Sequence, residues 1–350
     1  MKRFSILLLL FVQSGVALPV VPLATTPGNP GYTRFAVGLL ATAQREVLAA
    51  LSDVRMYRGD GATAELLAAL AGAASRGVPV RVLAELRRDG ALPEQGAAMA
   101  WLAERGVAVR WDAPEVTLHA KFLVVDRRWV VVGSTHWTAS ALTRSVQLDL
   151  AIESEELGEA FGRFFDHLWA GELKLTPQLG PAPWPQTALV PLLDPPQGGI
   201  HAGLLPALIR GARESVDVLI YRLGYYPAYA DSPSNRIVDE LCRAAARGVR
   251  VRVLLEGGED FPDLARDNRV AGSYLAACGV DVGFDPPGTT LHAKVLVVDG
   301  RDVVVTSANF SYTSLAQNVE AGVAVLGAPE LGVPLRAWFE LLWREARRLR

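Results

Sequence analysis

The sequence predicts an α/β domain that occurs twice in one chain, and three observations support this fold class. Residues 76–83 recur as residues 247–254, and the segment Leu-His-Ala-Lys at 118–121 recurs at 291–294 with nearly the same spacing. Helical and strand patterns alternate within each copy. Between the copies, prolines follow one another at short intervals, which is typical of an extended connector. We therefore expect an N-terminal domain at 18–175, a proline-rich linker at 176–187 and a C-terminal domain at 188–350.

Both copies predict the same elements in the same order. An amphipathic helix and a short strand come first, at 35–51 and 53–57 in the first copy and at 204–213 and 216–221 in the second. An alanine-rich helix follows and ends at Gly77 or Gly248, and the valine-rich segment after it is predicted as a buried parallel strand. Another helix, the strand that carries His-Ala-Lys and an aromatic-rich helix complete each copy. This alternation indicates a layered α/β domain.

The overall composition is that of a folded globular protein. Of the 350 residues, 50% are hydrophobic and 21% are charged, which excludes a disordered or fibrous chain. The 35 basic and 37 acidic residues leave a formal charge of −2. The sequence therefore carries no strong electrostatic bias toward nucleic acid, which is usually bound by a basic surface.

The first 17 residues have the pattern of a signal peptide. Lys2 and Arg3 precede an unbroken apolar run at 4–12, and small residues at 15–17 fit a cleavage site after Ala17. The alternative is a first buried strand or helix. Cleavage predicts a secreted or periplasmic protein.

The two cysteines, Cys242 and Cys278, lie near the ends of predicted helices in the second copy. An oxidising compartment would allow them to pair, while two buried thiols are the alternative. The sequence leaves both possibilities open.

Two scarce residue types coincide at equivalent points of the two copies. The chain has five histidines and four lysines, and His119 with Lys121, like His292 with Lys294, takes one of each. Positions i and i+2 of a strand face the same side, so an imidazole and an ammonium group can converge on one anion. A zinc site is not expected, because neither a His-Glu-x-x-His pattern nor cysteines at ligand spacing occur.

These segments resemble the paired HKD motifs of the phospholipase D superfamily. His119-x-Lys121-x4-Asp126 and His292-x-Lys294-x4-Asp299 carry the resemblance. Ser134 and His136 follow the first motif, Ser307 and Asn309 the second, and Asp149 and Glu320 come further on. The resemblance implies two tandem phospholipase D-like α/β sandwich domains, packed as a pseudo-twofold dimer within one monomeric chain. It also implies one shared site without metal or cofactor.

The resemblance also implies roles for these residues in phosphodiester chemistry. We expect His119 to attack phosphorus and form a phosphohistidine, while His292 protonates the leaving oxygen. Asp149 and Glu320 would each accept a hydrogen bond from the histidine of their own copy. The groups expected to hold the phosphate oxygens are Lys121, Lys294, Ser134, His136, Ser307 and Asn309.

The two motif aspartates are expected to have a structural role. Asp126 and Asp299 stand at an odd offset from their histidines, so on a regular strand they face away from the site. We expect them to be buried and hydrogen-bonded at the strand ends.

The sequence favours an exported phospholipase D that hydrolyses glycerophospholipids to phosphatidate and head group at a membrane surface. A metal-independent nuclease of the same superfamily and a phosphatidyl transferase are the alternatives, with nucleic acid disfavoured by the charge. A catalytically weakened binding protein is a further alternative, because His136 stands where the superfamily has asparagine.

Overall fold

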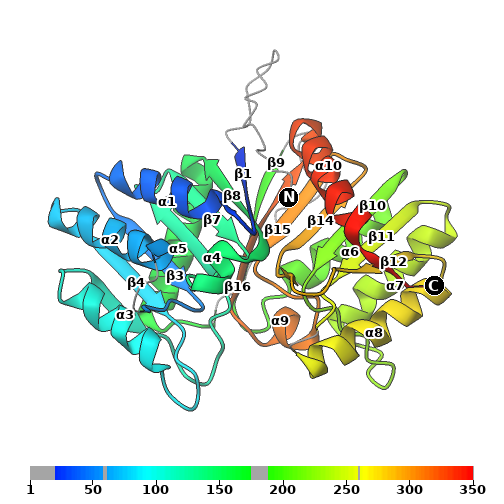
Figure 1. Cartoon of the computed structure of the whole chain (residues 1–350), viewed down its shortest axis with the longest axis horizontal. Coiled ribbons are helices and arrows are strands. Elements are labelled where there is room, and N and C mark those ends of the chain that lie inside the picture. The colour runs from blue at the N-terminus through cyan, green and yellow to red at the C-terminus, as the bar shows by residue number, and fades with distance from the viewer. Residues whose placement is uncertain (1–19, 58–60, 175–187, 259–260, 350) are drawn as a thin grey trace.

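The computed structural model describes residues 20–57, 61–174, 188–258 and 261–349, and these residues form two mixed β-sheets (Figure 1). The sheets run β2-β1-β8-β7-β6-β3-β4-β5 and β17-β12-β11-β10-β14-β15-β16-β9, and the short strand β13 of the second copy pairs with β8 of the first. The strands of the first sheet are β1 (Val20–Thr26), β2 (Asn29–Pro30), β3 (Val47–Leu51), β4 (Val80–Ala84), β5 (Ala108–Trp111), β6 (Lys121–Val125), β7 (Trp129–Gly133) and β8 (Ser145–Glu153). Those of the second copy are β9 (Ala188–Asp194), β10 (Ser215–Ile220), β11 (Arg250–Leu255), β12 (Asp281–Phe284), β13 (Thr290–Leu291), β14 (Lys294–Val298), β15 (Asp302–Thr306), β16 (Glu320–Leu326) and β17 (Arg347–Arg348).

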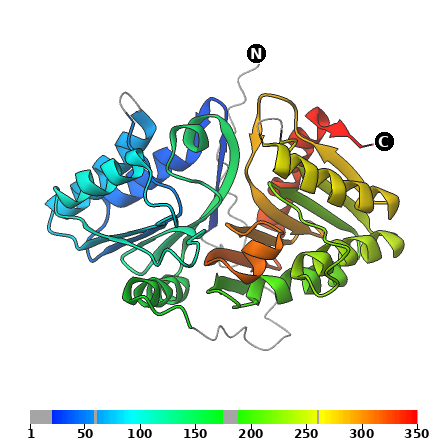
Figure 2. The same cartoon turned by 90° about the horizontal axis from the view of Figure 1, so that it is seen from below.

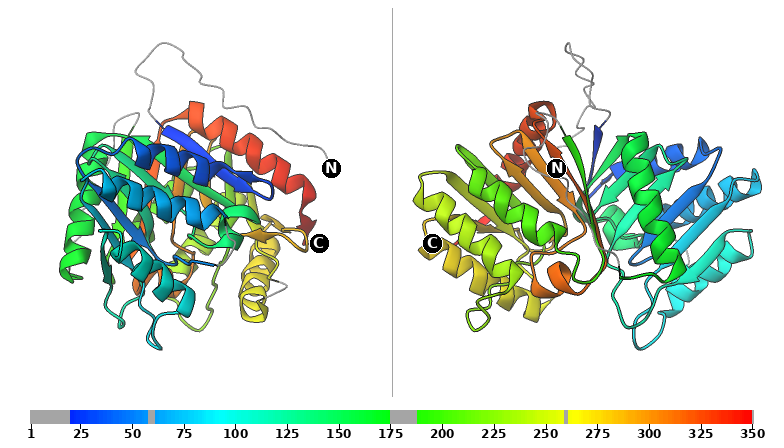
Figure 3. Two further views of the ribbon diagram at one scale, coloured as in Figure 1. Left: turned by 60° about the vertical axis from the view of Figure 1, so that its left-hand side comes forward. Right: turned by 180° about the vertical axis from the view of Figure 1, so that it is seen from behind.

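Ten helices in the described residues cover the two sheets (Figures 2 and 3). The first copy contains α1 (Gly31–Ala41), α2 (Gly61–Ser75), α3 (Pro93–Ala103), α4 (Ala139–Thr143) and α5 (Glu155–Ala170). The second contains α6 (Ile200–Gly211), α7 (Pro233–Ala246), α8 (Pro262–Ala277), α9 (Tyr312–Ala316) and α10 (Pro329–Glu345). The predicted duplicated α/β class is confirmed. Within these described ranges, no helix is both long and apolar enough to cross a membrane.

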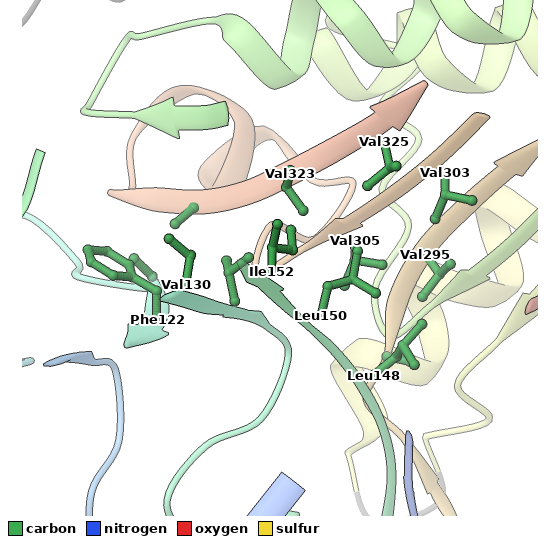
Figure 4. Close-up of a cluster of buried hydrophobic side chains, with 14 of the residues drawn as sticks. Phe122, Val130, Leu148, Leu150, Ile152, Val295, Val303, Val305, Val323 and Val325 are labelled. Atoms are coloured by element: carbon green, nitrogen blue, oxygen red, sulfur yellow. The ribbon is translucent and has the colours of Figure 1, made fainter. Parts of the chain in front are cut away.

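One hydrophobic core joins the two copies. Strands β6, β7 and β8 of the first sheet face β14, β15 and β16 of the second (Figure 4), and side chains of α5 and α10 complete the cluster. Leu148 and Leu150 of the first copy and Val305 and Val323 of the second belong to it, and each is at most 1% exposed. Because neighbouring residues of a strand point to opposite faces, the other face of each sheet packs against its own outer helices in a separate core. The central core therefore fixes one copy against the other.

The first helix and strand of the N-terminal copy differ from the sequence prediction. Helix α1 ends at Ala41, and residues 47–51, predicted as its last turns, form strand β3. This strand lies parallel to β4 and antiparallel to β6, and all five of its residues are buried. The run Val-Leu-Ala-Ala-Leu is aliphatic on every side, so periodicity alone did not distinguish a central strand from a helix end.

Other expectations concern the glycine ends and the cysteines. Gly77 and Gly248 adopt φ values of 84° and 85°, the left-handed conformation that a helix C-cap requires. Cys242 on α7 and Cys278 at the end of α8 form a disulfide, with their Cα atoms 5.3 Å apart. The predicted signal peptide and the predicted linker at 176–187 lie outside the described residues.

Candidate active site

Each motif histidine is held in place by the opposite copy. The His119 amide donates a hydrogen bond to the Val319 carbonyl over 2.9 Å, and the His292 amide donates to the Val146 carbonyl over 2.9 Å. Each histidine stands two residues before a strand, because β6 begins at Lys121 and β14 at Lys294. The exchanged contacts bring the two motifs together where the copies meet.

Glu320 stands behind His119. Its Oε1 and Oε2 atoms lie 2.8 and 2.9 Å from His119 Nδ1, and its side chain is fully buried. Asn318 Nδ2 donates to Oε1 over 3.1 Å, and Ser307 Oγ donates to Oε2 over 2.5 Å. Burial opposes the charge of Glu320, but His119 and Lys121 outweigh it and hold its pKa at about 2. This carboxylate therefore keeps the proton on His119 Nδ1 and leaves Nε2 as the reactive nitrogen.

Gln147 stands behind His292 in the same way. His292 Nδ1 lies 3.0 Å from Gln147 Oε1 and 3.2 Å from the Ser134 carbonyl oxygen. A carbonyl oxygen only accepts hydrogen bonds, so Nδ1 carries the hydrogen and Nε2 is the reactive nitrogen here too. Burial, followed by the charge of Lys294, sets the pKa of His292 well below its ordinary value. The two histidines thus share a tautomer but differ in the charge behind them.

Two buried lysines supply positive charge to the site. Lys121 Nζ donates to the His119 carbonyl over 2.5 Å, and Lys294 Nζ donates to the His292 carbonyl over 2.6 Å. Lys294 Nζ also lies 3.1 Å from His292 Nε2. Burial lowers the pKa of Lys121 to about 8 and that of Lys294 well below its ordinary value. An anion that enters would relieve the cost of burying two ammonium groups side by side.

The expected pairing of Asp149 and Glu320 with the histidines of their own copies is wrong. Glu320 contacts the histidine of the other copy, and Asp149 accepts hydrogen bonds from the Thr135 amide over 3.2 Å and from the Thr135 hydroxyl. The position equivalent to Glu320 is Gln147, since each stands 28 residues after its motif histidine. The equal spacing of 28 residues is the sequence signal that identifies Gln147. Gln147 was not predicted because only acidic residues were expected behind the histidines.

The two serines expected to bind phosphate use their hydroxyl groups elsewhere. Ser134 Oγ donates to the Leu148 carbonyl over 3.2 Å and accepts from the Leu148 amide over 3.1 Å. Ser307 Oγ bonds Glu320 and accepts from the Ala321 amide over 3.0 Å. Both serines are fully buried. They fix the neighbouring strands and the carboxylate, and their contact with a substrate phosphate stays a prediction.

His136 and Asn309 keep polar atoms without a partner. The His136 ring centroid lies 6.2 Å from that of His119 and 5.0 Å from that of His292. His136 Nδ1 and Asn309 Oδ1 are buried and have no hydrogen-bond partner. Burial, followed by the charge of Lys121, sets the pKa of His136 well below its ordinary value. Since a buried polar atom without a partner is costly, both side chains are available to a ligand in this site.

Asp126 and Asp299 each hold three consecutive amides and contact no motif histidine. Asp126 accepts from the amides of residues 44–46, and Asp299 from those of residues 213–215, over 2.7 to 3.2 Å. Both aspartates are half-buried and adopt positive φ, at 57° and 52°. The expected burial is therefore only partial, while the hydrogen bonds are those of a structural turn, as expected.

His201, which belongs to neither motif, is fully buried. Its Nδ1 lies 2.7 Å from Asp194 Oδ2 and its Nε2 lies 2.7 Å from Thr306 Oγ1. These hydrogen bonds connect helix α6 to strands β9 and β15.

Within the described ranges, no set of three histidine, cysteine or acidic side chains is placed to hold a metal ion.

An aromatic wall and a polar cavity flank the site. The Tyr221 ring lies 4.6 Å from that of His292 and 6.5 Å from that of Phe261, which is 48% exposed. A cavity of about 650 Å³ opens between the copies, and Arg87, Arg88, Thr117 and Asn318 are among the residues that line it. Since Asn318 bonds Glu320, this cavity reaches the hydrogen-bond network of His119.

A duplicated α/β chain with two facing His-x-Lys motifs defines the phospholipase D superfamily. The family model described as "Cardiolipin synthase, PLD-like domain" matches residues 39–169 and 205–343. The chain belongs to this family.

Curated relatives and solved structures show the same likeness. Cardiolipin synthase B of Escherichia coli (strain K12) is 27% identical over 228 residues, which cover 59% of this chain and 51% of the relative. Phospholipase D Y of Dictyostelium discoideum is 27% identical over 151 residues, which cover 40% of this chain and 33% of that one. The chain thus spans about half or less of the length of these relatives. The crystal structure of phosphatidylserine synthase from Haemophilus influenzae Rd KW20 matches 95% of this chain and 89% of its own, with a TM-score of 0.73 at 14% identity, and shows the same fold.

Proposed function

We propose that this chain cleaves the phosphodiester bond of glycerophospholipids through a phosphohistidine on His119. The observation that carries the proposal is the pair of motif imidazoles on either side of His136, each with Nδ1 bonded from behind and each beside a buried lysine. Hydrolysis yields phosphatidate and the free head group. The family and the names of its relatives support a phospholipid as substrate.

The reaction needs two proton transfers. His119 Nε2 attacks phosphorus, and Glu320 stabilises the positive charge that the phosphorylated ring acquires. His292, which takes up a proton on Nε2 once the anionic phosphate offsets the charge of Lys294, gives that proton to the leaving oxygen. Water, or an alcohol, then returns a proton to His292 and displaces His119 from phosphorus. Lys121 and Lys294 neutralise the non-bridging oxygens, and His136 and Asn309 complete their hydrogen bonds.

Transfer to an alcohol is the second candidate function. The names of cardiolipin synthase B and phosphatidylserine synthase favour transfer, because a synthase uses an acceptor other than water. The polar cavity beside Asn318 is large enough for a small polyol or a head group.

One assay tests the function. Purified protein in EDTA is incubated with vesicles of phosphatidylcholine or phosphatidylglycerol, with and without added glycerol, and in parallel with plasmid DNA. We expect head-group release that survives EDTA and disappears in His119→Ala and His292→Ala. A glycerol-dependent phospholipid product would assign transfer, whereas nicking of DNA without lipid turnover would make the chain a nuclease.

We also propose that the protein is exported after cleavage behind Ala17. The signal-peptide pattern and the disulfide, which forms readily only in an oxidising compartment, support export. N-terminal sequencing of the protein recovered outside the cytoplasm should begin at Leu18. Recovery of uncleaved protein with free thiols from the cytoplasm would reject export.

A further inference from the structure

A pair of carboxyl groups occurs in front of each motif, at equivalent positions of the two copies. Glu85 and Asp112 directly follow the parallel strands β4 and β5, and Glu256 and Asp285 directly follow β11 and β12. The ends of neighbouring parallel strands meet at one edge of a sheet, which places each pair side by side. Glu85, Glu256 and Asp285 are buried, and Asp112 is half-buried.

Each pair holds the residue that directly precedes a catalytic histidine. The Leu291 amide donates to Glu256 Oε2 over 2.5 Å and to Asp285 Oδ2 over 3.1 Å. The Leu118 amide likewise donates to Glu85 Oε2. The remaining oxygen of each aspartate accepts from the amide after the glutamate, Leu86 or Gly257, over 2.6 Å.

The two carboxyl groups of each pair are placed to share one proton. The Leu291 amide reaches an oxygen of both Glu256 and Asp285, and two full negative charges buried so close together would repel each other, which favours one protonated member. Burial, followed by the charge of the aspartate, raises the pKa of Glu85 and of Glu256 to about 8. Other titratable groups lie near the two carboxyl pairs. Lys121 is near the first pair, and Lys294, Tyr221 and Arg347 are near the second.

We propose that Glu85 and Glu256 are positioning residues, each acting as a neutral carboxylic acid that locks the backbone in front of one catalytic histidine. The chain of contacts runs from the aspartate to the glutamic acid, to the leucine amide and so to the histidine. Removal of the shared proton sets two buried negative charges against each other and loosens both histidines. This inference rests on the proposed function for its catalytic consequence, but the state of the carboxyl pairs can be measured without activity.

The first experiment measures stability against pH. In the folded protein the pKa of Glu85 and of Glu256 lies above the ordinary value of 4.5. The contribution of these protonated side chains to the free energy of unfolding is therefore fully present below pH 4.5 and is lost as the pH rises through about 8. In the double variant Glu85→Gln, Glu256→Gln, each new amide side chain still accepts from the leucine amide and can donate to the aspartate. Neither amide can ionise. We expect the fall in Tm between pH 6 and pH 9 to be at least halved in this double variant. The control is Glu65→Gln, which changes an exposed carboxyl on α2 and should leave the wild-type fall intact.

The second experiment measures kcat and KM with bis(p-nitrophenyl) phosphate. We expect Glu85→Ala to lower kcat at least tenfold with KM changed less than threefold, and Glu85→Gln to restore most of kcat. In the double glutamine variant, the alkaline fall of kcat should move upward by at least half a pH unit. If that variant shows the wild-type fall in both Tm and kcat, the proposal is wrong. If the wild type does not cleave the probe, the proposed function fails, and the Tm comparison still decides the state of the carboxyl pairs.

Discussion

Gln147 and Glu320 occupy equivalent positions, one behind each motif histidine, yet only Glu320 is charged. A carboxylate behind an imidazole stabilises its protonated or phosphorylated form, whereas an amide fixes the tautomer and adds no charge. The two histidines are therefore chemically unequal although the copies are related by duplication. This inequality supports His119 as the nucleophile, because its charged intermediate has the carboxylate partner.

Changing Gln147 to glutamate should alter the pH profile. A general acid acts only while it is protonated, so kcat/KM falls as pH rises through the pKa of His292 in the free enzyme. A new carboxylate beside His292 raises that pKa, and Gln147→Glu should move the falling limb upward by about 1–3 pH units. Gln147→Ala is the matched control, with lower kcat and no upward movement. A limb that stays in place in Gln147→Glu would exclude His292 as the acid.

The sequence predicted the motif residues but only part of their arrangement. His119, Lys121 and their counterparts were identifiable because scarce residue types coincide twice in a repeat. The exchange of partners between the copies was not predictable from the sequence. A repeated pattern shows which residues are equivalent, but it does not show which copy each residue contacts. The backbone contacts of the serine hydroxyl groups were not predictable for a similar reason, since they depend on the register of β7 with β8 and of β15 with β16.

At the level of elements, α5 and α10 pack directly on the turns that follow the motif aspartates. A Cβ atom at Gly158 would overlap the Arg127 backbone, and one at Gly332 would overlap the Gly300 backbone. Leu-Gly occurs at 157–158 and again at 331–332, and the close approach between a helix and a turn explains glycine at both places. The prediction of these two helices succeeded because their aromatic residues recur at helical spacing, whereas β3 carried no periodic signal.

Gly158→Ala should destabilise the protein by about 1–3 kcal/mol, because the added methyl group has no space. Gly96→Ala on α3 is a close control, since a Cβ there meets nothing within 4 Å and alanine favours a helix. It should leave the free energy of unfolding equal or raise it by up to about 1 kcal/mol. Urea denaturation of both variants checks this, and equal losses in the two would show that α5 does not pack as described.

The disulfide between α7 and α8 should also contribute to stability. It closes a loop with a sequence separation of 36, for which the chain-entropy model gives about 3–4 kcal/mol. We expect Cys242→Ala with Cys278→Ala to lower the free energy of unfolding by that amount in denaturant titrations. Reducing agent should lower the wild type to the same level and leave the variant unchanged. Insensitivity of the wild type to reducing agent would show that the bond does not form.

At the scale of the whole molecule, both motifs of the site come from one chain. The central core and the exchanged amides of His119 and His292 fix the two copies against each other. The single site should therefore be assembled within each monomer.

A mixture of two inactive full-length variants tests this arrangement. His119→Ala and His292→Ala chains, mixed in equal amounts, should stay inactive toward phosphatidylcholine vesicles, because no chain holds both histidines. Recovery of a quarter or more of wild-type turnover would show that chains exchange halves. Size-exclusion chromatography with light scattering should give the mass of a monomer.

The covalent link between the copies has a further consequence for how such a site can diverge. In an assembly of two identical chains, a codon change behind the histidine alters both sides at once, so a carboxylate can be kept twice or lost twice. A tandem gene releases this constraint, because each half mutates alone. Glutamine on one side and glutamate on the other is an outcome open only to the tandem arrangement, and it lets selection tune the acid without altering the nucleophile.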